Sequence, residues 1–344
     1  MYLEHFGLKK NPFLLSSAAD SLYYAESHRQ AAARLLFGVR QPNGVTLLLG
    51  SPGTGKTTLV RSLLGLMRAT PLVPSVIFAP MMETSTDVLF QTLSGFKVNV
   101  GRRSAPELFA FLQGVVDQMA AAGKEPLVII DEAQRLTGDA LDCVRLLSSL
   151  EREGRQSIRL LLVGQPELSQ TLSGENMTPL RQRISIRCQL VGLQFEEVWK
   201  YIALRIAAAG GDGRMVFQPD AIDALAVYSG GIPRVINVLA DHCLMAAFGE
   251  GADLVDSDIV CVVARSMELQ LDETMHRQAL ARKFPGEFNE ETWCSAVQEY
   301  QRYEAPDFIR KIAESIATTD DSALSEKRFH RTTEFASWTT SIEH

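Results

Sequence analysis

The glycine-rich segment at residues 50–58 combines the residue types that bind phosphate groups. Its first eight residues fit the pattern G-x-x-x-x-G-K-[ST], and the segment reads Gly50-Ser51-Pro52-Gly53-Thr54-Gly55-Lys56-Thr57-Thr58. Glycines let backbone N–H groups turn inward around a triphosphate, and a helix that begins here adds its dipole. We expect Lys56 to pair with the β- and γ-phosphates and Thr57 to offer its hydroxyl to Mg²⁺. The segment predicts a nucleotide site with ATP and Mg²⁺ as ligands.

Two carboxylates, Asp131 and Glu132, directly follow an apolar run. The run Leu127-Val128-Ile129-Ile130 predicts a buried strand, and ligands bind at the carboxyl ends of strands in open α/β sheets. Asp131 is the candidate Mg²⁺ ligand, and Glu132 is the candidate group that orients or deprotonates an attacking water. A second apolar run leads to Gln165, whose amide fits between the carboxylates and a γ-phosphate. The alternative for each run is an ordinary strand, after which the polar residues have no role in a site.

Arginines at two further places could complete such a site. Arg181, Arg183 and Arg187 accompany a β-like alternation, for which a solvated basic face is the usual explanation. The alternative is an arginine finger that reaches the γ-phosphate of a neighbouring subunit. Arg234 lies in the first turn of a predicted helix, where a cation opposes the helix dipole. A bound phosphate would explain this cation, and an exposed arginine without a role is the alternative.

Strands and helices alternate in the first part of the chain, as in a parallel sheet covered by helices. The predicted strands are residues 45–49, 76–79, 127–130 and 158–163, and the predicted helices are residues 56–68 and 104–122. After Val191 the apolar period fits helices only, at residues 195–209, 219–228 and 233–248. Further helices are expected at residues 290–303 and 307–316. The last ~25 residues are rich in Ser, Thr, Asp and Glu, and we expect them to be mobile.

The chain of 344 residues has a formal net charge of −7, most of which lies near its end. From Leu271 onward there are 14 acidic and 9 basic residues, so the preceding 270 residues are nearly neutral. This balance argues against coating of nucleic acid by bulk charge, but it leaves room for a local basic track. The acidic end is either a docking segment for a partner or an extension without a role.

Other classes of site find no support in the sequence. The five cysteines are scattered without a C-x-x-C pair, which predicts reduced thiols, and the histidines have no metal-ligand spacing. The start of the chain lacks the pattern of a signal peptide, and no apolar run approaches the ~18 residues of a membrane span. We therefore expect a cytoplasmic protein, or one peripheral to a membrane, with no integral membrane segment.

These features together resemble the AAA+ ATPases of the ExeA/GspA group, which are secretion-pathway proteins related to the transposition ATPases TniB and TnsC. The resemblance covers about the first four-fifths of the chain. The shared segments are Phe6-Gly7-Leu8 with Pro12-Phe13, Ser27-His28-Arg29-Gln30-Ala31, Asp131-Glu132-Ala133-Gln134, Gly164-Gln165-Pro166-Glu167-Leu168, Gln182-Arg183-Ile184, Tyr201-Ile202-Ala203-Leu204-Arg205 and Gly231-Ile232-Pro233-Arg234-Val235-Ile236-Asn237. In this group the opening segment, near Pro12 and Phe13, would lie by the adenine.

The resemblance implies an α/β fold of the AAA+ P-loop NTPase type, with helices on both sides of a parallel sheet. Residues 1–191 would form this core, residues 192–270 an all-helical lid, and residues 271–344 a helical and partly disordered acidic extension. By position, Gln165 is sensor 1, Arg234 is sensor 2, and Arg183 is the arginine finger, with Arg181 and Arg187 as rivals. The resemblance also implies assembly of the protein with itself into a ring or filament.

Two functions are compatible with these expectations. The first is an Mg²⁺-dependent ATPase that drives or regulates assembly of a protein complex in secretion or at the envelope, placed in the cytoplasm or at the inner membrane. ExeA-like proteins usually continue into a transmembrane helix and a peptidoglycan-binding region, which we do not expect here, and this weakens the secretion role. The second is an ATP-dependent DNA-binding regulator of transposition. Its candidate phosphate contacts, although surface arginines are usually solvated, are Arg102, Arg103, Arg152, Arg155 and Arg159.

Overall fold

The structure, a computed structural model, describes residues 2–14, 23–41, 44–67, 70–78, 83–101, 103–152, 155–281 and 290–301. The chain forms two compact units, Met1–Ala305 and Pro306–His344, and every described residue lies in the first. The helix expected at residues 307–316 and the last ~25 residues therefore lie outside the described residues.

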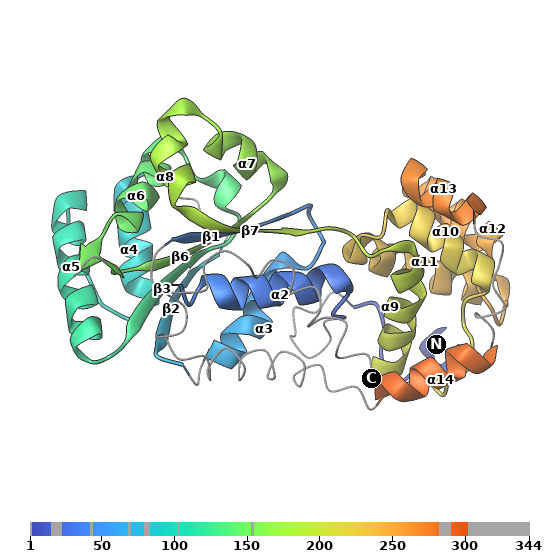
Figure 1. Cartoon of the computed structure of the whole chain (residues 1–344). Helices are drawn as coiled ribbons and strands as arrows, with labels where there is room; N and C mark the ends of the chain where they lie inside the picture. The colour runs from blue at the N-terminus through green and yellow to red at the C-terminus, as the bar shows by residue number, and fades with distance from the viewer. Residues whose placement is uncertain are drawn as a thin grey trace, which may run out of the picture. The chain divides into compact units, whose positions relative to one another are not determined.

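A five-stranded parallel sheet lies at the centre of the α/β part of this unit (Figure 1). The strand order is β2-β3-β6-β1-β7, and every neighbouring pair is parallel. The strands span Leu72–Ile77 (β2), Glu125–Ile130 (β3), Arg159–Gly164 (β6), Val45–Gly50 (β1) and Ile184–Leu190 (β7). Two short strands, β4 (Glu151–Arg152) and β5 (Arg155–Gln156), pair separately and antiparallel. The predicted parallel α/β sheet is confirmed.

Helices cover both faces of the sheet, because its central strands are apolar on both sides. One face carries α2 (Glu26–Gly38) and α3 (Lys56–Met67), and the other carries α4 (Ser85–Gly95), α5 (Ala105–Ala121) and α6 (Gly138–Ser148) (Figure 1). The 3₁₀ helix η2 (Ala133–Arg135) follows β3. Between β6 and β7 lie α7 (Pro166–Leu172), η3 (Glu175–Met177) and α8 (Thr178–Arg183).

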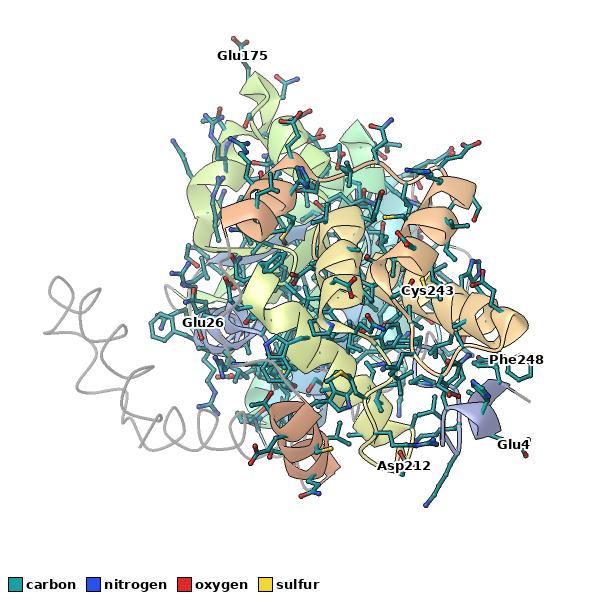
Figure 2. The ribbon with its side chains drawn as sticks, turned by 90° about the vertical axis from the view of Figure 1, so that its right-hand side faces the viewer. Glu4, Glu26, Glu175, Asp212, Cys243 and Phe248 are labelled. Carbon is teal, nitrogen blue, oxygen red and sulfur yellow. The ribbon has the colours of Figure 1, made fainter. Side chains whose placement is uncertain are left out.

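The part of the unit after β7 is helical, as predicted. It contains α9 (Phe195–Ala208), α10 (Pro219–Ser229), α11 (Pro233–Glu250), α12 (Ser257–Ser266) and α13 (Glu273–Ala281), and α14 (Glu290–Gln301) packs on α9. The N-terminal helix α1 (Tyr2–His5), with Glu4, lies near Phe248 of α11 (Figure 2). The ring centroid of His5 is 5.5 Å from that of Phe248. We call α1 and α9 to α14 together the helical cluster.

The core of the helical cluster draws on both ends of the described chain. Phe6 and Phe13 from the opening segment and Trp293 from α14 are buried in the same apolar core as α9 to α12. The ring of Phe13 lies 6.0 Å from that of Phe217. No helix among the described residues is long and apolar enough to cross a membrane.

One predicted strand has different limits in the structure. The strand expected at residues 76–79 spans Leu72–Ile77, so it begins four residues earlier and includes Pro74. Proline has no N–H for the ladder, but β2 is an edge strand, where this loss is tolerated. The β-like alternation that begins at Ile184 is a complete strand, β7, at the opposite edge of the sheet.

Candidate functional site

The glycine-rich loop connects the end of β1 to the start of α3. It follows Gly50 and ends at Lys56, the first residue of the helix. Thr54 closes the loop, because its hydroxyl donates to the carbonyl oxygen of Ser51 at 2.9 Å. Gly53 has a left-handed φ of 83°, and a Cβ at this position would lie 2.7 Å from Cβ of Arg234. The loop therefore requires glycine here, both for its backbone conformation and for the close approach.

The ammonium group of Lys56 lies within this loop. The side chain is buried, and Nζ donates to the carbonyl oxygens of Gly50 at 2.7 Å and Ser51 at 3.1 Å. Burial lowers the pKa of Lys56, while the carboxylates of Glu132 and Asp131 oppose that shift. The loop thus holds a cation at a helix N-terminus, which already favours anions.

A carboxylate that follows β3 meets the helix that follows the loop. Asp131 is buried, and Thr57 Oγ1 donates to its Oδ2 at 2.6 Å. The backbone N–H of Asp131 donates to the carbonyl oxygen of Ile77 at 2.9 Å, which fixes the residue to the end of β2. Hydroxyl and carboxylate oxygens are the ligands that Mg²⁺ prefers, so this pair fits the predicted metal ligands.

Two side-chain amides hold the carboxylate of Glu132. This residue has a φ of 55°, which is uncommon for a residue other than glycine. Gln134 Nε2 donates to Glu132 Oε2 at 2.7 Å, and Gln165 Nε2 donates to the same oxygen at 3.2 Å. Gln134 Oε1 accepts from the backbone N–H of Gln165 at 3.0 Å. The structure brings Glu132 and Gln165 together as expected, and it adds Gln134, for which the sequence suggested no role.

Helix α11 brings Arg234 from the helical cluster to the loop. The backbone N–H of Arg234 donates to the carbonyl oxygen of Gly53 at 3.3 Å. The Arg234 charge is close enough to Lys56 to lower the pKa of that lysine. Just before α11, the carbonyl oxygen of Gly231 accepts from the Leu193 N–H at 2.7 Å, which ties the β7–α9 connection to the same turn. The expected site residue Arg234 therefore does lie at the loop.

Two of the candidate finger arginines, Arg181 and Arg183, lie at the other end of the sheet. α8 ends at Arg183, and the next residue, Ile184, pairs with Val45, the first residue of β1. The loop follows the last residue of β1, so one strand length, about 20 Å, separates Arg183 from it. Among the described residues the side chain of Arg183 has no hydrogen-bond or ion-pair partner, whereas the side chain of Arg181 donates to the Ser173 carbonyl oxygen at 3.1 Å. Arg187, the third candidate, is exposed on β7.

The arginines considered as nucleic-acid contacts have mixed surroundings. Arg159 forms an ion pair with Glu125, with 2.8 Å between nitrogen and oxygen. The guanidinium of Arg103 lies over the ring of Phe111, at 5.2 Å from its centroid. Outside the described residues lie Arg102 and the side chains of Arg152 and Arg155.

Helix α2 makes a contact with the loop that the sequence did not predict. His28 is buried, and its Nε2 lies 2.9 Å from the carbonyl oxygen of Thr54. Burial lowers the pKa of His28, against the opposing effects of this hydrogen bond and of the Glu197 carboxylate. The only signal in the sequence is that the Ser27–Ala31 segment matches the ExeA/GspA group.

Other clusters of metal-ligating residues are absent from the part of the chain that the structure describes. The five cysteines are free, and burial raises the pKa of Cys143 and Cys243 to about 12. Burial therefore favours the protonated form of these two thiols at neutral pH.

Residues 39–172 match a protein family described as AAA domain. The chain carries an AAA domain. This match contains β1, the glycine-rich loop, Asp131, Glu132 and Gln165, and it identifies the α/β part as an ATPase-type nucleotide-binding fold. It ends before Arg183 and before helices α9 to α14.

The resemblance to the ExeA/GspA group is confirmed by a curated relative. General secretion pathway protein A of Aeromonas hydrophila is 36% identical over 261 residues, which cover 75% of this chain and 47% of that protein. The chain therefore spans about half the length of this relative.

Two solved structures share the fold over both parts. The ORC1 protein of Aeropyrum pernix, in a complex with DNA, has a TM-score of 0.57 and 18% identity, covering 76% of this chain and 70% of that one. Cdc6p of Pyrobaculum aerophilum has a TM-score of 0.56 and 20% identity, covering 71% and 67% of the two chains. At such low identity these structures establish the fold alone.

Proposed function

We propose that this protein binds ATP together with Mg²⁺ and hydrolyses it at the interface between subunits of an oligomer. The observation that carries the proposal is the 2.6 Å hydrogen bond from Thr57 to Asp131, because it joins the loop helix to the segment that bears Glu132. These two oxygens would hold Mg²⁺, which would neutralise charge on the β- and γ-phosphates.

Each remaining residue of the site has a role in this proposal. Lys56 would exchange its two carbonyl partners for phosphate oxygens, because a charged acceptor forms the stronger hydrogen bond. Glu132 would orient or deprotonate the attacking water. Gln165, which donates to the same carboxylate, would respond when the γ-phosphate departs. Arg234 would contact the nucleotide from the helical cluster.

Arg183 supports hydrolysis between subunits. It lies about one strand length, ~20 Å, from the loop of its own chain, which is too far for direct contact with a nucleotide bound there. Its lack of a partner among the described residues leaves the guanidinium free for a neighbouring copy. A ring or filament in which α8 of one subunit faces the loop of the next would use Arg183 as a finger, and this requires self-assembly.

We further propose that hydrolysis drives assembly of a protein complex, in the cytoplasm or at the surface of the inner membrane. The name of the Aeromonas hydrophila relative, which refers to general secretion, supports this class of partner. The surroundings of Arg159 and Arg103 do not favour the DNA alternative, because one is paired with Glu125 and the other is stacked on Phe111. DNA binding that requires ATP and weakens as the salt concentration rises would instead support a role as a DNA-binding regulator of transposition.

The proposed reaction is tested with a substitution that preserves size. Glu132→Gln removes the carboxylate, so we expect ATP to bind with wild-type affinity and to turn over at least ~100-fold more slowly. Glu175→Gln, which removes an exposed carboxylate on η3, is the matched control and should turn over normally. Wild-type protein that binds ATP with Mg²⁺ but shows no turnover at concentrations where it assembles would refute the proposal.

A further inference from the structure

Helix α2 contacts the glycine-rich loop through one buried histidine. His28 Nε2 lies 2.9 Å from the carbonyl oxygen of Thr54, and the side chain is only 1% exposed. A carbonyl oxygen can only accept a hydrogen bond, so Nε2 carries the hydrogen and donates it. Nδ1 is then the unprotonated nitrogen, and it has no hydrogen-bond partner in the described structure. The hydrogen bonding of this buried ring is therefore directed at the loop alone.

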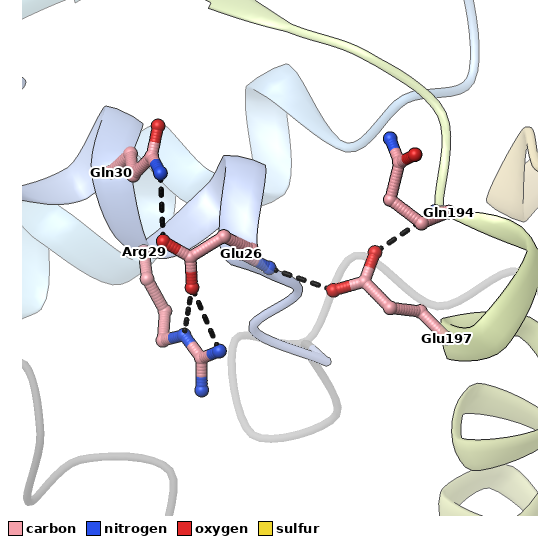
Figure 3. A network of polar contacts seen from close by, with 5 residues as sticks. All are labelled: Glu26, Arg29, Gln30, Gln194 and Glu197. Atoms are coloured by element: carbon pink, nitrogen blue, oxygen red, sulfur yellow. Dashed lines mark hydrogen bonds and ion pairs between the residues drawn. The ribbon is translucent and has the colours of Figure 1, made fainter. Parts of the chain in front are cut away.

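The start of α2 is held from the other side by α9. The residue before α2, Ala25, has no polar side chain that could cap the helix. Glu197 of α9 supplies the acceptor, because its Oε1 accepts from the backbone N–H of Glu26 at 2.9 Å (Figure 3). Its Oε2 accepts from the Gln194 N–H at 2.9 Å, which is part of the capping box of α9 itself. One carboxylate thus caps two helices.

The charges around this carboxylate favour the arrangement. Both helix N-termini carry partial positive charge, which the negative Glu197 complements. The carboxylate of Glu26 does not compete with Glu197 for the helix N–H group, because it accepts from side chains on the next turn of α2. These donors are Arg29 Nη2 at 2.9 Å and Gln30 Nε2 at 2.7 Å (Figure 3). Glu26 and His28 are two positions apart, about 3 Å along the helix axis. The first turn of α2 is therefore a short, stiff connection between the loop and α9.

We propose that His28 is a positioning residue for nucleotide binding, and that the first turn of α2 couples the loop to α9 through Glu197. The inference rests on the proposed function, since it requires a nucleotide in the loop. A nucleotide that displaces the Thr54 carbonyl oxygen also displaces His28, and the change reaches the Glu197 contact on α9. The helical cluster thereby has a second connection to the loop, besides the contact of Arg234.

The first experiment compares two amides at position 28. The amide nitrogen of glutamine reaches about as far as Nε2 of histidine, so His28→Gln retains the donor to Thr54, whereas the shorter asparagine of His28→Asn does not reach. We expect His28→Asn to weaken binding of a fluorescent ATP analogue by about tenfold, because a buried carbonyl oxygen loses its partner. His28→Gln should stay within about threefold of wild type. Equal affinities for the two variants, with equal melting temperatures, would mean that His28 only fills space.

The second experiment tests the coupling without changing a buried residue. Glu197→Gln retains the shape of the side chain but replaces one acceptor oxygen by a donor, so it cannot cap both helices. In wild-type protein, we expect ATP with Mg²⁺ to slow amide hydrogen exchange across α9. In Glu197→Gln, the loop should still bind ATP while this slowing of α9 is lost. Glu196→Gln, an exposed neighbour in the same first turn, is the matched control and should respond as wild type does.

The outcomes separate this inference from the proposed function. Wild-type protein that does not bind ATP would overturn both. ATP binding in wild type, together with an unchanged response of α9 in Glu197→Gln, would overturn the coupling alone. A response of α9 that is lost equally in Glu196→Gln would also overturn it, because the effect would then follow net charge and not the shared cap.

Discussion

Replacing Gln134 by leucine should slow ATP hydrolysis by about tenfold and leave ATP binding intact. Gln134 donates to Glu132 Oε2 at 2.7 Å and accepts from the Gln165 N–H at 3.0 Å, and leucine of similar size can do neither. A hydrogen bond to a charged group contributes about 1.5–3 kcal/mol. Because Gln165 Nε2 still donates to the same oxygen, we take the lower end of this range, and about 1.4 kcal/mol corresponds to a tenfold change in rate.

The assay is phosphate release at saturating ATP and Mg²⁺, together with titration of a fluorescent ATP analogue. We expect kcat to fall and the affinity to stay within about twofold, because the hydrogen bonds of the Gln134 side chain join Glu132 and Gln165 and not the loop. Urea unfolding should show a loss of about 1 kcal/mol from the unpaired N–H of Gln165. Gln170→Leu makes the same change on an exposed position of α7 and should leave kcat unchanged. A folded Gln134→Leu variant with wild-type kcat would refute the reasoning.

Three further predictions concern pH, assembly and stability. Burial lowers the pKa of His28, so His28 takes up the proton that charges its ring more readily in the unfolded chain than in the folded one. The free energy of unfolding should therefore fall as the pH drops through about 6.5, the ordinary pKa of histidine. Urea titrations at several pH values should show a weaker dependence on pH for His28→Gln. Arg183→Ala should bind ATP normally but lose turnover, and mixing it with Glu132→Gln subunits should restore part of the activity; no restoration would count against a finger acting in trans. Tyr201→Phe leaves Asn237 Oδ1 without its 2.7 Å donor, so thermal melts should show a loss of about 1–2 kcal/mol, and an unchanged melt would contradict this assignment.

The parts of the site that could be predicted from sequence are those fixed by neighbouring residues. The loop needs glycines, a lysine and a threonine at set spacing, so Lys56 and Thr57 were recognised from the pattern alone. Asp131 and Glu132 were recognised because an apolar strand ends directly before them. These residues meet in the structure because parallel strands end at one edge of the sheet.

The remaining contacts depend on pairing between distant segments, which local patterns do not contain. The bond between Gln134 and Gln165 exists only because β3 and β6 are neighbours in register. The contact of His28 with the loop depends on how α2 packs on the sheet, and the shared cap depends on where α9 begins. The start of β2 at Leu72 is not evident from the sequence, because Pro74 is tolerated in a strand only at the edge of a sheet, and the edge position depends on the strand order.

The burial of Phe13 in the helical cluster has a consequence for synthesis of the chain on the ribosome. Its ring partner Phe217 is about 200 residues further along, with the entire sheet between them. At about 5–20 residues per second, the opening segment is translated about 10–40 s before that partner. The α/β part can fold first, while Phe6 and Phe13 remain exposed to solvent or to a chaperone. Completion of the helical cluster is therefore a late step, in which Phe6 and Phe13 dock against residues that are translated much later.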